Sequence, residues 1–409
     1  MTDVALWLHG IHVADVDEPS PFRYRLAFTT EAIQRFGVGS TVLSLGLPVS
    51  PNPVNDSAPP KIPVRSLLQG FLPEGAMLEY VARTLGVATT RTLDLLSAVG
   101  MECAGAVQFL PAGISPDTGS VLPLSQEEVT AMVETLPTFT APDGPLPHAS
   151  LGGLQDKLLL TKLDGGWGWP QNGAASTHIL KPEPLFGPVP HLVEAEHWSL
   201  HVAQACGLPA ASSDLNVFGD RTVLVVERYD RTIHGERIHQ EDFCQALSLP
   251  PEAKYEPEFE HPPRLRRMAR LLSTYSTNPS QTRRDLLRQV VFNAALGNAD
   301  AHTKNYSVLL SKAGEPTMAP LYDCAPLSIM NPHFHAIGQM INHRRFLEEL
   351  TIDDFTEEAV YWGMGPDEAA STVLDTLNAI VGAAEQIPSP APLPDLGAKV
   401  ADRVTGLMR

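Results

Sequence analysis

The first 111 residues combine two hydrophobic periods, which predicts a small α+β unit. The segments ALWLHGIHVADV and FRYRLAFT alternate apolar and polar positions like two strands of a hairpin, and VGSTVLSLGLPV predicts a further strand. In PEGAMLEYVARTLGV the apolar residues recur at helical spacing, and Gly86 is placed to end that helix. A second helix, TRTLDLLSAVG, and a strand, AGAVQFLP, complete the unit. The Pro-rich residues 48–63 predict irregular structure.

The pattern changes again in the remainder of the chain. Residues 112–148 are rich in Pro, Gly and acidic positions, which predicts a connector with one helix at 125–136 behind a Ser125 N-cap. Residues 149–231 are strand-rich with one helix at 193–206, and residues 232–409 are mainly helical with one hairpin near 306–323. A last short helix is expected after PSPAPLP. These boundaries define four parts: an N-terminal subdomain, a connector, a strand-rich part and a helical part.

The composition argues against a membrane-spanning or secreted protein. Of the 409 residues 43% are hydrophobic, yet no apolar run approaches the roughly 20 residues needed to cross a bilayer, and the N-terminus lacks signal-peptide features. We therefore expect a cytoplasmic protein without membrane association. The four cysteines lack CxxC spacing, which predicts buried free thiols.

The charge balance bears on possible partners. A net charge of −18 argues against direct, non-specific nucleic-acid binding. The segment RLRRMAR at 264–270 leaves a local basic face open, although a solvated helix face is the favoured interpretation over a phosphate-binding patch.

The segment RRDLLRQVVFNAALGNADAHTKNYSVLL, residues 283–310, concentrates candidate chemistry. Its apolar stripe predicts a helix ending at Gly297, followed by the polar loop NADAHTKN and a strand. Asp300 and Asn305 are five residues apart, which suits a carboxylate that accepts a hydroxyl proton and an amide that helps hold magnesium. Asp323, at the end of the following hairpin, is the expected second magnesium ligand. Taken alone, NADAHTKN could also be an ordinary turn between helix and strand, and Asp323 could equally be a helix or turn cap.

Upstream segments supply candidate phosphate contacts. HASLGGLQDKLLL is a small-residue loop in which Gly152 and Gly153 let backbone amides approach phosphate, with Gln155 and Lys157 as further donors. The loop matches neither common phosphate-binding pattern, so an ordinary turn remains open. THILKPE places Lys181 at a strand end, where an ammonium can neutralise phosphates. The next helix offers Glu194 or Glu196 as its partner, and the apolar strand TVLVVE predicts an adenine pocket at Glu227.

These segments follow the order of parts in a two-lobed protein kinase. That order is a phosphate loop, a strand with a lysine, a helix with a glutamate, a hinge, a helical lobe, an Asp-x4-Asn loop and a final aspartate. The HRD and DFG signatures themselves are absent from the sequence. The fold class expected is α+β and protein-kinase-like. The sequence resembles the HipA family, the serine/threonine kinase toxins of bacterial toxin–antitoxin pairs. The stretches that carry the resemblance are LLQGFLPEG, CAGAVQFLP, SLGGLQDK, THILKPE, VVERYDR, HQEDFCQALSLPPEAKYE, GNADAHTKNYSVLL and APLYDCAP.

Carried over by motif, the resemblance implies a set of functional residues. Asp300 would be the catalytic aspartate, Asn305 and Asp323 the magnesium ligands, and Ser150 an autophosphorylation site whose modification inactivates the enzyme. The residues implied to bind ATP are Gly152, Gly153, Leu154, Gln155, Lys157, Lys181, Glu227, Tyr229, Gln240, His302 and Lys304.

The resemblance also implies partners and a biological role. The family's usual partner is a small helix-turn-helix antitoxin, so that DNA is reached only through that protein, and its targets are aminoacyl-tRNA synthetases whose phosphorylation halts translation and arrests growth. From residue 330 onward the likeness is only general. Two alternatives stay open: a related kinase acting on a small molecule, and a non-catalytic co-repressor bound to an antitoxin.

Overall fold

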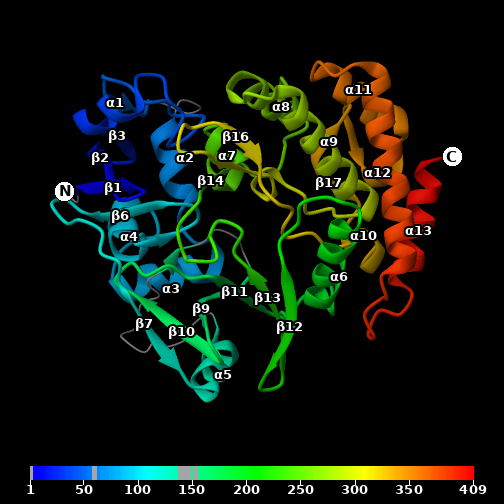
Figure 1. Ribbon diagram of the computed structural model, residues 1–409, viewed down its shortest axis with the longest axis horizontal. Helices are drawn as coiled ribbons and strands as arrows, with labels where there is room; N and C mark the ends of the chain where they lie inside the picture. The colour runs from blue at the N-terminus through cyan, green and yellow to red at the C-terminus, as the bar shows by residue number, and fades with distance from the viewer. Residues whose placement is uncertain (1–2, 58–61, 137–148, 151–154) are drawn as a thin grey trace. The chain divides into compact units, whose positions relative to one another are not determined.

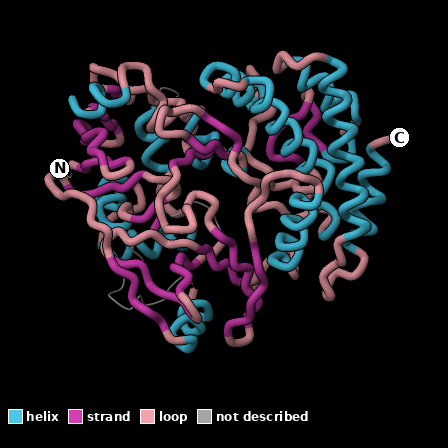
Figure 2. Tube along the Cα trace, in the orientation of Figure 1, coloured by secondary structure: helices cyan, strands magenta, loops and turns pink. Residues whose placement is uncertain are grey.

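The computed structural model describes residues 3–57, 62–136, 149–150 and 155–409. The chain forms two compact units. Unit 1 contains Met1–Pro182, Asn216–Pro251 and Leu309–Glu315, and unit 2 contains Glu183–Leu215, Glu252–Val308 and Pro316–Arg409. Strands gather in unit 1 and helices in unit 2 (Figure 1, Figure 2). Among the described residues, no helix is both long enough and apolar enough to cross a membrane.

The first sheet of unit 1 has the strand order β4-β3-β2-β1-β6. In β3, Tyr24, Leu26 and Phe28 are buried and alternate with more exposed positions, so one face of the strand enters the core. The segment ALWLHGIHVADV is two strands rather than the single strand predicted, because His9 and Gly10 both take positive φ and reverse the chain. The strands are β1 (Val4–Leu8), β2 (Ile11–Ser20), β3 (Arg23–Phe28), β4 (Val54–Asn55) and β6 (Val107–Pro111).

The strand predicted in VGSTVLSLGLPV is wrong, because this apolar segment is a buried loop. Burial runs through neighbouring residues instead of alternating between them. Buried irregular backbone needs hydrogen-bond partners from elsewhere. Here the Leu45 N–H donates to Glu241 Oε1 at 2.7 Å. A Cβ on Gly46 would stand 2.9 Å from the Ala246 carbonyl, so glycine permits the close approach of these two backbones.

Both helices predicted in the first 111 residues are confirmed, and so is the capped helix behind Ser125. Gly86 ends its helix with φ 68°, and Ser125 and Glu128 make both bonds of a capping box. Two helices of this part were not predicted. One is Thr30–Phe36, and the other begins at Pro63, inside the Pro-rich stretch, where proline suits the first turn. The helices of unit 1 are α1 (Thr30–Phe36), α2 (Pro63–Gly70), α3 (Gly75–Leu85), α4 (Thr92–Val99), α5 (Gln126–Thr135) and α7 (Phe243–Ala246).

A six-stranded sheet has the order β12-β13-β11-β9-β10-β7. A turn at Gly219 and Asp220 joins β12 to β13. Strand β7 comes from the stretch predicted as a connector, and it pairs with β10. The strands are β7 (Ser120–Leu124), β9 (Leu158–Leu163), β10 (Gly166–Gln171), β11 (His178–Pro182), β12 (Ser213–Phe218) and β13 (Arg221–Glu227); three short strands are β5 (Glu102–Cys103), β8 (Ala149–Ser150) and β14 (His239–Asp242).

Unit 2 is built around two long helices, α9 and α12, which pack against each other. Helix α12 also packs against α6, α11 and α13 (Figure 1). The helix predicted at 193–206 and the last helix after PSPAPLP are confirmed. The helices are α6 (Leu192–Ala205), α8 (Arg264–Tyr275), α9 (Pro279–Leu296), α10 (Leu327–Met330), α11 (Ile352–Tyr361), α12 (Pro366–Gln386) and α13 (Leu396–Leu407).

The hairpin predicted near 306–323 is present as β15 (Ser307–Leu310) and β16 (Pro316–Met318), and the Ser311 N–H donates to the Glu315 carbonyl at 3.0 Å in its turn. A second hairpin, β17 (Ala336–Ile341) and β18 (Arg344–Phe346), was not predicted. Asn342 and His343 turn it with positive φ. All four cysteines are buried free thiols, as predicted.

Candidate active site

The polar loop begins where α9 is forced to end. Gly297 follows the last helical residue with φ 88°, a left-handed conformation that favours glycine. A Cβ at this position would also stand 2.4 Å from Ser328 Oγ. The helix therefore stops at a fixed point and releases the chain into the loop of residues 298–305.

Asp300, Asn305 and Asp323 are linked through hydrogen bonds to backbone carbonyls. The Asn305 side-chain amide donates to the Asp300 carbonyl at 3.0 Å and to the Asp323 carbonyl at 3.4 Å. Asn298 adds a donor to the Asp323 carbonyl at 3.4 Å and accepts from the Asp300 N–H at 3.2 Å. Asp323 holds φ 55°, a backbone state that often marks functional sites when the residue is not glycine. The structure thus brings these three predicted residues together, with Asp300 and Asp323 only half-buried.

Thr303 anchors the middle of the loop in the interior of unit 2. It is fully buried, and its Oγ1 accepts from Arg264 Nη1 at 2.8 Å and from Gln339 Nε2 at 2.9 Å. Arg264 opens the segment RLRRMAR, for which a solvated face or a phosphate patch was considered; neither interpretation holds for this residue, because it is 1% exposed. Burial raises the pKa of Glu256 to about 7, although its carboxylate accepts the Arg264 and Met340 N–H groups.

His302 and Lys304, both predicted to contact nucleotide, are buried beside this anchor. The Lys304 carbonyl accepts the Tyr322 hydroxyl at 2.5 Å. Tyr255 lies over the other side of the loop: its hydroxyl donates to Asp300 Oδ1, and its ring meets the His302 ring edge-on at 5.2 Å. Tyr255 lies in the stretch HQEDFCQALSLPPEAKYE, but no role was predicted for it.

Lys181 lies in β11 opposite Leu224 of β13, and it is 7% exposed. The Gln155 side-chain amide donates to the Pro182 carbonyl at 3.3 Å, which joins the end of the predicted phosphate loop to the lysine strand. Of the two glutamates considered on α6, Glu196 is buried, whereas Glu194 pairs with His191 at 3.4 Å.

The predicted hinge residues lie at the end of β13. Glu227 is exposed there, and the Tyr229 hydroxyl donates to Gln240 Oε1. The intervening residues Arg228 and Asp230 point inward, into a buried ionic cluster that sequence reasoning missed. The alternation of outward and inward positions in ERYD, directly after an apolar strand, is a signal that was available. The cluster consists of Glu102, Arg228, Asp230, Arg231 and Arg237.

Part of the predicted phosphate loop lies outside the described residues. Gly152, Gly153 and Leu154 belong to that part, and only the backbone of Ser150 is described, in β8, where it pairs in parallel with Cys103 of β5. Lys157 is described as half-buried.

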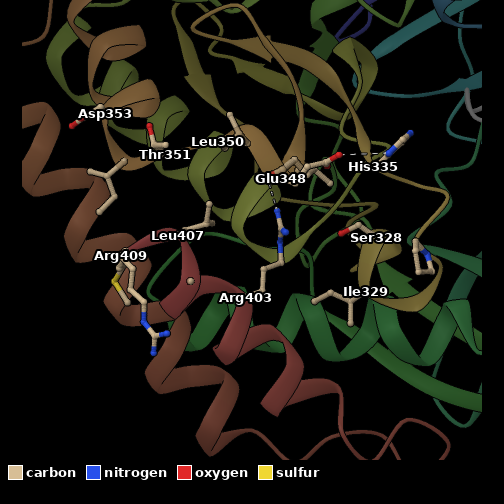
Figure 3. A pocket seen from close by; sticks show the side chains of 15 residues that line it. Ser328, Ile329, His335, Glu348, Leu350, Thr351, Asp353, Arg403, Leu407 and Arg409 are labelled. Carbon is tan, nitrogen blue, oxygen red and sulfur yellow. Dashed lines mark hydrogen bonds and ion pairs between the residues drawn. The ribbon is translucent and has the colours of Figure 1, made fainter.

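A cavity of about 950 Å³ in unit 2 is lined in part by Ser328 and Arg403 (Figure 3), and both residues contact the backbone near the end of α9. Arg403 of α13 reaches into it and donates to the Leu347 carbonyl at 3.3 Å and the Ala294 carbonyl at 3.2 Å. The Ser328 N–H donates to the Gly297 carbonyl. Asp300 and Asp323 do not line this cavity, so the catalytic candidates lie elsewhere.

The sequence of the chain matches two protein-family models. A family model described as HipA-like C-terminal domain matches residues 149–384, and one described as HipA N-terminal domain matches residues 4–110. The serine/threonine-protein kinase toxin HipA of Shewanella oneidensis is 32% identical over 333 residues, which cover 77% of this chain and 73% of that protein. The chain belongs to the HipA family.

Other relatives agree with this assignment. The putative kinase Y4mE of Sinorhizobium fredii is 36% identical over 313 residues, which cover 74% of this chain and 73% of that protein. The solved structure of the Shewanella oneidensis toxin–antitoxin system, HipA with HipB and operator DNA, matches at a TM-score of 0.78 with 26% identity, covering 99% of this chain and 96% of that chain. As a HipA homologue, the chain is a member of a family of serine/threonine protein kinases. The resemblance and the α+β, protein-kinase-like fold are confirmed.

Proposed function

We propose that this protein is a magnesium- and ATP-dependent kinase that phosphorylates serine or threonine on a protein, as the toxin of a toxin–antitoxin pair. The observation that supports this most directly is the linkage of Asp300, Asn305 and Asp323 through shared backbone carbonyls. Phosphoryl transfer depends mainly on positioned carboxylates and metal-bound phosphates, and this loop supplies the residue types required.

Each of the three residues has a role that fits its contacts. Asp300 is half-buried and carries the carboxylate that orients the acceptor hydroxyl and takes its proton. The Asn305 amide nitrogen is engaged with carbonyls, which leaves its oxygen as the end that would hold a metal, together with the Asp323 carboxylate. This oxygen donor set fits magnesium, which proteins commonly hold with one or two carboxylates and substrate phosphates. When bound, magnesium would neutralise charge on those phosphates.

The other roles rest on the motif resemblance and on local geometry. Lys181 would neutralise ATP phosphates, the loop from Gly152 to Lys157 would cradle them, and Glu227, Tyr229 and Gln240 would form the adenine contact. Ser150 is the proposed autophosphorylation site. His302 and Lys304, in the proposed catalytic loop, would bind the nucleotide.

A partner and a target complete the proposal. The homologue in Shewanella oneidensis was solved with HipB and operator DNA. We propose a DNA-binding antitoxin for this chain as well, and the net charge of −18 favours DNA contact through such a partner. An aminoacyl-tRNA synthetase is the proposed substrate, whose phosphorylation would stop translation.

The first experiment incubates the purified protein with magnesium and labelled ATP, alone and with cell lysate, and locates the label by mass spectrometry. Label on Ser150 and on a lysate protein is the expected result. Label on neither contradicts a protein kinase.

Asp300→Asn tests the assignment of the catalytic carboxylate. It should lower transfer by about 10²- to 10⁴-fold, the contribution typical of a general base, with the fold intact by circular dichroism. Asp402→Asn, at an exposed position of α13, is the matched control and should transfer like the wild type. Wild-type autophosphorylation by Asp300→Asn would refute the assignment.

A further inference from the structure

Tyr255 occupies one of the two carboxylate oxygens of Asp300, the residue proposed to act on the acceptor hydroxyl. Its hydroxyl donates to Asp300 Oδ1, and its ring packs edge-on against His302 with an interplanar angle of 85°. A catalytic aspartate must accept a hydrogen bond from the acceptor hydroxyl before transfer. The Tyr255 hydroxyl is therefore already a donor to the carboxylate that the hydroxyl of a substrate serine or threonine would have to reach.

The backbone on both sides of Tyr255 is held in place. The preceding carbonyl, of Lys254, accepts the Thr303 N–H at 3.0 Å, and the following N–H, of Glu256, donates to the Gly338 carbonyl at 3.1 Å. These bonds tie the segment to the catalytic loop and to β17. The Tyr255 side chain can thus leave Asp300 only by rotating about its own torsions, and at 49% exposure it has solvent to rotate into.

We propose that Tyr255 is an acceptor-selecting residue: its phenol competes with the substrate hydroxyl for Asp300, and a substrate must displace it. This inference rests on the proposed function, because it assumes that Asp300 is the catalytic carboxylate. Competition of this kind weakens apparent affinity for the acceptor without changing the chemistry once the phenol has moved. Acceptors with further contacts to the enzyme displace it, whereas poorly bound hydroxyls do not.

Tyr255→Phe tests the proposal because it deletes only the competing hydroxyl and keeps the ring against His302. The KM for acceptor should fall about three- to tenfold, the range expected for a partly exposed hydrogen bond to a carboxylate. The kcat and the KM for ATP should stay at wild-type values. The acceptor is a degenerate serine and threonine peptide library. Tyr361→Phe, at an exposed position of the same unit, is the control for loss of a phenol elsewhere.

An unchanged acceptor KM in Tyr255→Phe would overturn the proposal, and so would a fall in kcat, which would mean that the phenol holds Asp300 in its productive orientation. Phosphate on Tyr255 of the wild-type protein would overturn it too, because the residue would then be an acceptor itself. These outcomes are separable from failure of the proposed function. If Asp300→Asn transfers phosphate like the wild type, or the wild type transfers none, the proposed kinase function fails. If only the prediction for Tyr255→Phe fails, the proposed kinase function still stands.

Discussion

Glu102→Gln removes a buried carboxylate that pairs with three guanidiniums. Glu102 Oε1 lies 2.9 Å from Arg228 Nη1 and 2.8 Å from Arg231 Nη2, and Arg237 pairs with Oε2. Glutamine keeps the shape of the side chain but leaves Asp230 as the carboxylate paired with Arg228 and Arg231, and it takes the ionic contact with Glu102 away from Arg237. Because the Glu102, Arg228 and Arg231 side chains are at most 2% exposed, water cannot replace the lost charge.

The size of the loss follows from the pKa of Glu102. Burial alone would raise it, but the charges of Arg231, Arg237 and Arg228 outweigh burial and lower the pKa from 4.5 to about 2. A depression of about 2.5 units corresponds to about 3 kcal/mol of folding stability. Breaking a buried ion pair by removing one partner typically costs about 3–5 kcal/mol. The two routes agree, and we expect Glu102→Gln to lose about 3 kcal/mol.

The assay is urea unfolding followed by circular dichroism, with Glu79→Gln on the exposed face of α3 as the control. A depressed carboxyl pKa stabilises the folded protein above pH 4.5 and loses that effect as pH falls toward 2. The difference between wild type and Glu102→Gln should therefore be full near neutral pH and should shrink below pH 4.5. A loss under about 1 kcal/mol at neutral pH, or a difference independent of acid pH, would refute the reasoning.

Two further predictions concern other buried groups. Thr303→Val should lower kcat about 10- to 100-fold, because Arg264 and Gln339 lose the acceptor that anchors the loop of residues 298–305. Thr303→Ser keeps the hydroxyl and should have the wild-type kcat. Equal kcat values for the two variants in steady-state kinetics would contradict the role of Thr303 as an anchor. Burial raises the pKa of Glu241 from 4.5 to about 8, so stability should fall as pH rises across that window. In thermal unfolding, Glu241→Gln should weaken this pH dependence and leave the part that comes from Glu256. An equal pH dependence in the variant would contradict this.

Much of the local fold could be predicted from the chain. The helix ending at Gly86, the capping box at Ser125 and the helix ending at Gly297 were all found, because caps and helical periods involve residues a few positions apart. The strand expected around Leu45 failed because a continuous apolar run looks the same whether it is a buried strand or a buried loop. What decides between them is a distant partner, here Glu241.

The candidate site also has a part that the sequence predicted and a part that it did not. Asp300 and Asn305 lie in one short loop, so their spacing made them candidates for the proposed chemistry, and the hairpin after them added Asp323 as a candidate. The contact of Arg264 with Thr303, which anchors that loop, could not be predicted from the sequence. Arg264 lies in a basic segment typical of a helix surface, and only the packing of the structure shows that it is buried. Charge in a sequence does not reveal whether a distant acceptor will offset its desolvation.

The sequence by itself determined the residue types of the loop, the helix that presents it and the family to which the chain belongs. These features depend on neighbours along the chain, which periodicity, caps and motifs record directly. Only the tertiary structure decided which side chains from distant segments contact the loop of residues 298–305. Tyr255 reaches Asp300 across 45 residues and Arg264 reaches Thr303 across 39. Such contacts arise when separate elements pack into one core, and no local pattern encodes them.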